Sequence, residues 1–414
     1  MRSVLHGHPR LVGLVISALV TWLLNEVLFP TPLNGYLVVL FAYVGGVVVA
    51  RLSRGDHRYA ALGPLVPLVF LAQNSIGVTE LTQILILAIA ALGLDLITGW
   101  TGQLNLAQGI FIGLGAYVTA ILASKHGWPI LLTLPLAGLV AAAAGLLLGV
   151  LALRFDGVYL AVLTSAVALA GPVLLLHYKS ITNGVNGIIV NQPQPPGAFA
   201  DWLDTDQWGY YVTVVMAIIA VCISWNLLSG RIGRALRALR DSPIAAKGIG
   251  VDLTRYKVLA FAVGSFWAGL AGGLYAMTIG FVSADSFGLF YSIQFLTIIV
   301  VGGLSTISGA FVGAVVIYEL STNVQTIGFA TTVNGVALSI PQAAVYAILL
   351  ILVVIFAPKG IIGIFSDKSD WSRLTQRLRG GHNRSTDVVQ AQADRPPIVR
   401  LDAPEDPHPA ITSY

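Results

Sequence analysis

Long apolar runs, separated by short charged or Gly- and Pro-rich breaks, dominate the chain. A run of roughly 20 mostly apolar residues is long enough to cross a lipid bilayer as a helix. Such runs predict membrane helices at 11–29, 36–50, 61–77, 79–98, 109–124, 130–153, 158–177, 209–229, 257–280, 290–303, 305–325 and 340–357. Several of these runs are short or broken by Gly or Pro, so we expect some to be re-entrant. The pattern predicts an all-α, polytopic membrane protein with about 10–12 membrane segments.

Composition supports this fold class. Hydrophobic residues make up 56% and charged residues 10% of the 414 residues, against about 25% charged residues in soluble domains. The net charge of +4 arises from basic residues between apolar runs, which indicates cytoplasmic loops and argues against nucleic-acid binding. The single cysteine, Cys222, lies in an apolar run, so the sequence predicts neither a disulfide framework nor a cysteine-based metal site.

Three regions of the chain differ in character. Residues 1–77 hold the first apolar runs and are predicted to be additional N-terminal membrane segments. We expect the first of them to stay uncleaved, because no small-residue cleavage site follows it. Residues 78–365 hold most of the other apolar runs and form the predicted membrane core. Residues 366–414 are poor in apolar positions and rich in Arg, Gly, Asp and Pro, which predicts a disordered cytoplasmic tail whose first part contacts membrane lipid.

The longest charged interruption covers residues 230–257. Its basic residues are Arg231, Arg234, Arg237, Arg240, Lys247, Arg255 and Lys257. Short loops rich in Lys and Arg stay on the cytoplasmic side of a membrane. This loop therefore fixes the orientation of the neighbouring helices. The turn at Arg154 should lie on the same side, and residues 178–208 should be extracytoplasmic.

Within this loop the sequence predicts a short helix. Asp241 or Ser242 is suited to cap its first backbone N–H groups, and Pro243 suits its first turn. Ile244, Ala245 and Ala246 would continue the helix, and Gly248 and Gly250 would end or bend it. A solvated loop and a docking element for a cytoplasmic partner are both compatible with this pattern.

Two segments of the chain match each other at a separation of 200 positions. Residues 102–113 (GQLNLAQGIFIG) align with residues 302–313 (GGLSTISGAFVG), with identical residues at 102/302, 104/304, 109/309, 111/311 and 113/313. The match predicts an internal duplication, in parallel or inverted orientation. Gly-interrupted apolar segments at corresponding positions of two transporter halves indicate the substrate path. The small-residue runs 269–273 and 309–313 are predicted to allow close helix packing.

Polar side chains near these segments are the candidates for lining a translocation path. The neutral ones are Gln103, Asn105, Gln108, Ser305, Thr306 and Ser308, and the intramembrane carboxylate is Asp95. Neutral hydrogen-bonding groups would let a zwitterion pass without a deep binding well. The same residue types also form hydrogen bonds between helices, so both roles stay open. A carboxylate at membrane depth is costly and marks a functional candidate.

The sequence argues against an enzyme. It contains no phosphate-binding loop of the form G-x-x-x-x-G-K-[ST], no H-E-x-x-H helix and no G-x-S-x-G elbow. We therefore expect this chain to bind no cofactor of its own. The acidic positions Asp201, Asp204 and Asp206 lack the glycine and terminal Glu of a calcium loop. They are predicted to begin a solvated helix, and no metal site is expected.

Four segments of the core resemble the branched-chain amino-acid permease family of ABC importers. They are LGLDLITGWTGQLNLAQG at 92–109, the charged loop with its Ala-Ala pair and TRYK run, FLTIIVVGGLSTISGAFVG at 295–313, and APKGIIG at 357–363. The last of them resembles the M-type more than the H-type subunit. Family members often carry an acidic residue beside the Ala-Ala pair, whereas here Ser242 and Pro243 precede it and Asp241 is the nearest acid.

The resemblance implies a permease subunit of an ATP-driven importer in the prokaryotic inner membrane. The chain would form half of the path for branched-chain or related amino acids, paired with an H-type permease. An extracytoplasmic binding protein would deliver substrate, and two cytoplasmic ABC ATPases would hold ATP and Mg. The residues implied to couple to the ATPase are Asp241, Ile244, Ala245, Ala246, Gly248 and Gly250. Two alternatives remain: a urea or amide permease of the same superfamily, and a stand-alone proton-coupled carrier that needs Asp95.

Overall fold

The structure is a computed structural model that describes residues 77–155, 157–197, 203–327, 331–333 and 336–338, with isolated positions between 348 and 362. Its long helices are α5 (Val78–Leu94), α6 (Gln108–His126), α7 (Ile130–Ala152), α8 (Val158–His177), α10 (Thr205–Ser229), α13 (Leu253–Ile279), α14 (Leu289–Gly302) and α15 (Ile307–Ile327). The predicted segments before Gly77, most of 340–357 and the tail from 366 lie outside the described residues.

Shorter elements connect the long helices. A π-helical turn, η2 (Asp95–Gly99), extends α5, and α11 (Arg231–Asp241) and α12 (Pro243–Gly248) lie between α10 and α13. The connections also contain α9 (Lys179–Thr182), η3 (Gly184–Asn186), η4 (Ala284–Phe287) and the strands β1 (Ile188–Ile189), β2 (Phe281–Val282), β3 (Thr331–Val333) and β4 (Val336–Leu338). β1 pairs with β2 and β3 with β4, both antiparallel.

Among the described residues, six helical segments are long and apolar enough to cross a membrane: Val78–Gly99, Gln108–His126, Ile130–Ala152, Val158–His177, Thr205–Ser229 and Leu253–Ile279. Their bounds lie close to those predicted from the apolar runs. The runs 290–303 and 305–325, predicted as separate spans, instead form a pair, Leu289–Gly302 and Ile307–Thr322, bent by 117°. The all-α polytopic fold is confirmed, and the described residues contain six spans, or seven if the bent pair counts as one.

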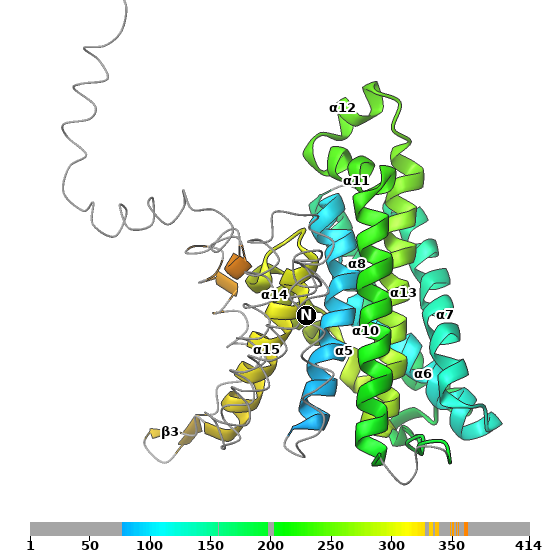
Figure 1. The fold of residues 1–414 in the computed structure, drawn as a ribbon. Coiled ribbons are helices and arrows are strands. Elements are labelled where there is room, and N and C mark those ends of the chain that lie inside the picture. Colours follow the sequence, from blue (N-terminus) through cyan, green and yellow to red (C-terminus); the bar gives the residue numbers. More distant parts are fainter. Residues whose placement is uncertain are drawn as a thin grey trace, which may run out of the picture. The chain divides into compact units, whose positions relative to one another are not determined.

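Helix α13 lies at the centre of this bundle, against α5, α6 and α7 (Figure 1). Small residues allow this close approach. A Cβ at Gly115 of α6 would meet the carbonyl of Gly269 in α13, and a Cβ at Gly272 would meet the carbonyl of Ile112. Glycine at such crossings lets helix backbones touch. The predicted packing role of residues 269–273 is confirmed, and Gly313 packs in the same way against the carbonyl of Ile298.

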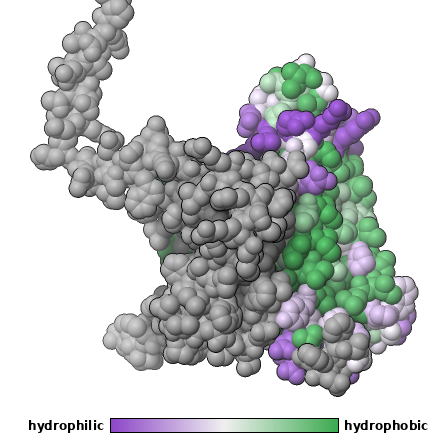
Figure 2. All heavy atoms as spheres, in the orientation of Figure 1, coloured by the Kyte–Doolittle hydropathy of each residue, from purple (hydrophilic) through white to green (hydrophobic). Residues whose placement is uncertain are grey.

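The outer surface of the bundle is apolar. Leu169 and Val173 of α8 and Leu147 of α7 are mostly exposed, whereas nearly every residue of α5 is buried. Figure 2 shows the apolar side of the described helices ending in polar bands at both ends. Contact of exposed Leu and Val side chains is favourable with lipid tails and unfavourable with water, so this surface fits a membrane-embedded protein.

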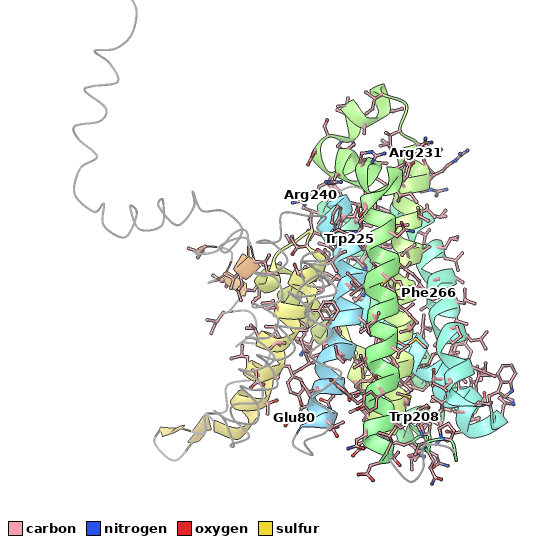
Figure 3. The ribbon with its side chains drawn as sticks, viewed as in Figure 1. Glu80, Trp208, Trp225, Arg231, Arg240 and Phe266 are labelled. Carbon is pink, nitrogen blue, oxygen red and sulfur yellow. The ribbon has the colours of Figure 1, made fainter. Side chains whose placement is uncertain are left out.

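Basic residues gather at one end of the bundle. The end with α11 and α12, called the α12 end, carries Arg231 and Arg240, whereas Glu80 and Trp208 lie at the opposite end (Figure 3). The turn at Arg154 belongs to the α12 end, because Gly149 of α7 packs against Val258 near the start of α13. The basic bias makes the α12 end cytoplasmic. It also makes the segment with α9, η3 and β1 extracytoplasmic, since β1 pairs with β2 just after α13 ends.

This orientation predicts opposite labelling of two exposed positions. The natural Cys222 is replaced by Ser, and one cysteine is introduced as Val185→Cys in η3 or as Lys247→Cys in α12. A membrane-impermeant maleimide should label Val185→Cys in intact cells. Lys247→Cys should react only after the cells are permeabilised. Labelling of both variants in intact cells would contradict the orientation.

Candidate functional site

The charged loop folds as two short helices joined by a tight turn. α11 ends at Asp241, and the Ser242 hydroxyl then accepts a hydrogen bond from the backbone N of Ala245 at 3.3 Å. Pro243 follows as the first residue of α12, where its missing N–H costs nothing. α12 ends at Gly248, and Gly250 adopts φ +81°. The predicted short helix is confirmed, with Ser242 as its N-cap.

α12 presents an apolar tip. Ile244 is 87% exposed and Ile249 77% exposed, and Figure 2 shows this apolar tip beyond a polar band. Among the other predicted coupling residues, Asp241, Ala245, Gly248 and Gly250 are exposed. Ala246 is 1% exposed and faces the protein. Ile249 was missed by the sequence reasoning, although its place between Gly248 and Gly250 was a signal.

The polar band below the tip comes from α11. We call Arg231, Arg234, Arg237 and Arg240 the arginine band; all four are exposed. The other face of α11 buries Leu236 and Leu239, so the three-residue spacing of the arginines follows one face of the helix. The guanidinium of Arg237 lies 5.4 Å from the ring centre of Trp100, a cation–π contact that fixes α11 to the end of α5.

Residues 102–107, called the first break, are irregular backbone between η2 and α6. Gly102 lies at the α12 end, because a Cβ there would sit 3.3 Å from Cγ of Arg240. Gln108, at the start of α6, donates from Nε2 to the carbonyl of Ala90 at 2.7 Å. Ala90 precedes Gly99 in the same helical segment, so it lies about 13 Å farther from the α12 end, at 1.5 Å per residue. The first break therefore runs back into the bundle beside α5.

Polar side chains satisfy the backbone of the first break. Asn105 Oδ1 accepts from Ala107 N at 3.0 Å, and Leu106 N donates to Thr164 Oγ1 at 3.0 Å. Non-helical backbone at membrane depth is stable only with such partners. Asn105 and Gln108 thus hold the break in this conformation.

Gln103 behaves differently from its neighbours. Its side chain is 7% exposed, and neither the amide N nor the amide O has a hydrogen-bond partner among the described residues. A buried amide without a hydrogen-bond partner lowers the free energy of unfolding by about 1–3 kcal/mol. Of the predicted path residues in the first break, Gln103 is therefore the one whose polar group is available to water or to a passing solute.

Residues 303–306, called the second break, separate α14 from α15. Gly303 adopts φ +120° and Ser305 φ +60°, the left-handed region that a non-glycine residue seldom occupies. Thr306 Oγ1 donates to the Gly303 carbonyl at 2.6 Å. Ser308 is half-buried in the first turn of α15. The second break thus has its own local hydrogen bonds.

Asp95 joins the second break to η2. The backbone N of Ser305 donates to Asp95 Oδ1 at 2.8 Å, and Trp100 Nε1 donates to Asp95 Oδ2 at 3.2 Å. The Ser305 hydroxyl donates to the Gly99 carbonyl at 2.6 Å and accepts a hydrogen bond from Arg240. We call Asp95, Trp100, Arg240 and Ser305 the break junction. The structure thus brings Asp95 and Ser305 together with a residue of the charged loop, which sequence reasoning had not linked to them.

The two matching sequence segments have the same local structure. Each is an irregular break at the α12 end that leads into a helix, α6 at Gln108 and α15 at Ile307. Both helices run away from the α12 end (Figure 1), so the corresponding segments share one direction. The glycines at 109 and 309 are both packed against backbone, Gly109 against Gly288 and Gly309 against Gly303.

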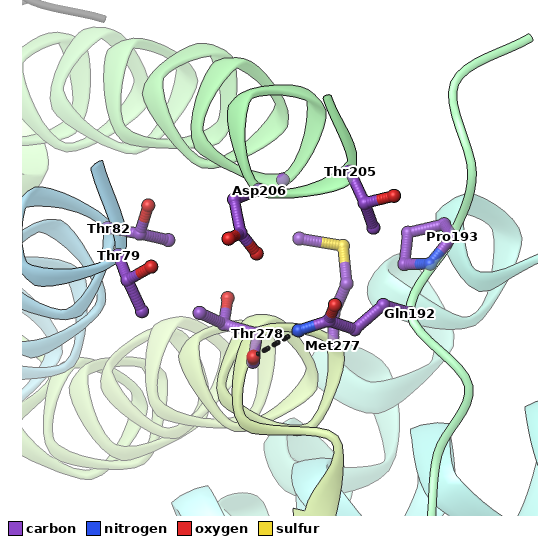
Figure 4. A pocket seen from close by; sticks show the side chains of 9 residues that line it. Thr79, Thr82, Gln192, Pro193, Thr205, Asp206, Met277 and Thr278 are labelled. Carbon is purple, nitrogen blue, oxygen red and sulfur yellow. Dashed lines mark hydrogen bonds between the residues drawn. The ribbon is translucent and has the colours of Figure 1, made fainter. Parts of the chain in front are cut away.

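The acidic positions at the opposite end have a structural role. Asp204 is the N-cap of α10 and forms a capping box with Gln207, as predicted for a helix start. Asp206 lines a small pocket with the side chains of Thr79, Thr82 and Thr205 (Figure 4). Gln192 closes one side of this pocket by donating from Nε2 to the Thr278 carbonyl at 2.8 Å. Asp201 lies outside the described residues.

Comparison with protein families gives one match over most of the described chain. Residues 76–357 match the family of the branched-chain amino acid transport system permease component. This match covers more than half of the 414 residues and includes α12 and both breaks. No solved structure matches the chain.

Individual relatives are permeases whose names state different substrates. The chain is 35% identical over 268 residues to the high-affinity branched-chain amino acid transport system permease protein LivM of Salmonella typhimurium, covering 59% of this chain and 62% of LivM. It is 29% identical over 302 residues to the permease protein LivH of Methanocaldococcus jannaschii, covering 71% and 92%. The galactofuranose transporter permease protein YtfT of Escherichia coli is 25% identical over 258 residues, covering 60% and 72%. The chain thus spans less than two thirds of the length of LivM.

Proposed function

Because this chain belongs to the family of branched-chain amino acid transport system permease components, we propose that it forms one half of the translocation path of an ATP-driven importer. Its higher identity to LivM than to LivH assigns it to the M-type. It is a multi-pass protein of the inner membrane. Its partners are an H-type permease as the other half of the pore, two cytoplasmic ATPases that hold ATP and Mg, and an extracytoplasmic binding protein.

One observation carries this proposal above the others: α12 offers an apolar tip on the cytoplasmic side, and α11 connects that tip to both breaks. Ile244 and Ile249 are mostly exposed although they lie beyond the apolar surface of the spans. Exposed isoleucines in water are stabilised by burial in a partner. The arginine band on the neighbouring helix α11 adds positive charge beside the tip, which suits a partner with acidic groups.

Branched-chain amino acids are the proposed cargo. The LivM and LivH relatives carry that substrate class in their names, but the galactofuranose permease shows that relatives in this group serve other solutes. Neutral polar groups at the two breaks suit a zwitterion or a polar uncharged solute equally. We propose that the binding protein selects the substrate, and that Gln103 contacts it in transit because its buried amide has no partner among the described residues.

The geometry of Asp95 argues against the stand-alone proton-coupled carrier. Both carboxylate oxygens already accept hydrogen bonds, one from the Ser305 backbone and one from the Trp100 indole. This is the arrangement of a fixed acceptor that holds two segments together. A group that binds and releases protons in each cycle needs access to water, and Asp95 is 1% exposed.

The test of this function is an affinity purification of the detergent-solubilised chain from its native membrane, with identification of the co-purifying proteins. We expect two P-loop ATPase subunits and a second permease, with leucine or isoleucine uptake that requires ATP in liposomes. A chain that purifies alone and accumulates substrate under a proton gradient would overturn the proposal.

A further inference from the structure

We infer that Arg240, Ser305 and Asp95 form a mechanical link that transmits movement of the charged loop to the two helix breaks. The inference rests on the proposed function and names the residues through which its coupling acts. In this link Arg240 moves with α11, Ser305 is the moving point of the second break, and Asp95 is the fixed acceptor in η2. All three are positioning residues.

The link is continuous in the structure. Arg240 lies in the last turn of α11, directly before the turn into α12. Its guanidinium donates to the Ser305 hydroxyl, and that hydroxyl donates to the Gly99 carbonyl at 2.6 Å. One serine side chain therefore joins the charged loop, the end of η2 and the second break. A displacement of α11 cannot leave the second break unchanged unless one of these hydrogen bonds is lost.

The backbone conformation of Ser305 makes the second break sensitive to the loss of these contacts. Its φ of +60° lies in the left-handed region, which a non-glycine residue keeps only when its surroundings hold it there. The holding groups here are Asp95, which accepts the backbone N–H, the Gly99 carbonyl, which accepts the hydroxyl proton, and Arg240, which donates to the hydroxyl. Withdrawal of Arg240 removes one of the three. The backbone of Ser305 can thus stay in the left-handed region while Arg240 is bound and leave it when Arg240 is withdrawn.

The same helix also reaches the first break. Gly102 packs against the side chain of Arg240, with its hypothetical Cβ 3.3 Å from Cγ. One turn earlier on α11, Arg237 stacks on Trp100, which donates to Asp95. Movement of α11 therefore acts on both breaks at once, and these breaks are the two matching segments of the internal duplication.

The test uses the co-purified transporter in liposomes and measures ATP hydrolysis and substrate uptake on the same preparation. Arg240→Gln and Ser305→Ala should each lower uptake about tenfold, within the usual range of coupling between sites, while ATP hydrolysis stays within about twofold of wild type. Arg154→Gln removes the same charge at the same end of the bundle, from an exposed residue in the turn after α7 and outside the arginine band, and should leave both rates unchanged. Ser305→Gly tests the hydroxyl alone, because glycine accepts φ +60° without strain and keeps the N–H; it should resemble Ser305→Ala.

Several outcomes would overturn the link. Equal losses of ATP hydrolysis and uptake in Arg240→Gln would make it an assembly contact, and unchanged uptake would remove it from the cycle. A wild-type preparation without ATP-dependent uptake would instead contradict the proposed function itself. The ratio of ATP hydrolysed to substrate moved therefore distinguishes the two failures.

The role of Asp95 has its own test through Trp100. Asp95→Asn keeps one acceptor oxygen but places an amide N–H against either the Trp100 indole N–H or the Ser305 N–H. Uptake should fall in this variant, and the added change Trp100→Phe should restore most of it, since it removes the competing donor and keeps a ring beneath Arg237. A proton-carrying Asp95 predicts no rescue by Trp100→Phe, and that result would overturn its assignment as a fixed acceptor.

Discussion

Ile244→Asp is expected to abolish transport and to release the ATPases from the purified chain, while leaving the permease folded in the membrane. Ile244 projects from α12 with 87% of its surface exposed, so no packing among the described residues depends on it. Burial of one Ile side chain in a partner contributes about 1.5–3 kcal/mol, which corresponds to an affinity change of roughly 10- to 150-fold. A carboxylate at the same point adds the cost of removing its charge from water.

The measurement is the amount of ATPase that co-purifies with the tagged variant, together with ATP-dependent uptake in liposomes. Ile189→Asp is the matched control, because Ile189 is also an exposed isoleucine but lies in β1 at the opposite end. It should retain the ATPases at the wild-type level. If Ile244→Asp retains them equally well, α12 is not the docking element.

The sequence predicted the helices of the core well because membrane burial requires uniform apolar runs. The run 130–153 became α7 at Ile130–Ala152, and the run 158–177 became α8 with the predicted bounds. The cap and the end of α12 were also predictable, since Ser242, Pro243 and Gly248 act through local backbone geometry. Each of these features depends on residues a few positions apart.

Features that depend on distant contacts were not predictable in this way. Arg240 and Ser305 are 65 positions apart in the sequence but form a hydrogen bond. The apolar runs also do not determine the angle of 117° between α14 and α15. The internal duplication still located both breaks, because the glycines that interrupt helices are visible in the sequence. Ala246 was predicted to couple to the ATPase because the Ala-Ala pair resembles the family pattern, and the structure shows that its side chain is buried. A charged substitution there would disturb the fold of the loop, so Ile244 is the better test position.

The packing of α13 leads to the largest expected effect on stability. In Gly272→Ala the added Cβ meets the backbone carbonyl of Ile112 in α6. A backbone carbonyl cannot turn aside as a flexible side chain can, so the helices must separate. Overpacking of this kind costs about 1–3 kcal/mol, and α13 contacts α5, α6 and α7 together. We expect a melting temperature several degrees below wild type in detergent, or no monodisperse protein.

Gly209→Ala is the matched control for this variant. It is the same substitution in the interior of another span, α10, where the added Cβ meets only the terminal methyl group of Met277 at 3.8 Å. Alanine is more favourable than glycine in a helix by about 1 kcal/mol, so this variant should melt at or slightly above the wild-type temperature. The difference in melting temperature between the two variants therefore reports the steric effect of an added Cβ between α6 and α13. If the two variants melt together, α13 has room beside α6, and the central packing of the bundle is looser than the structure has it.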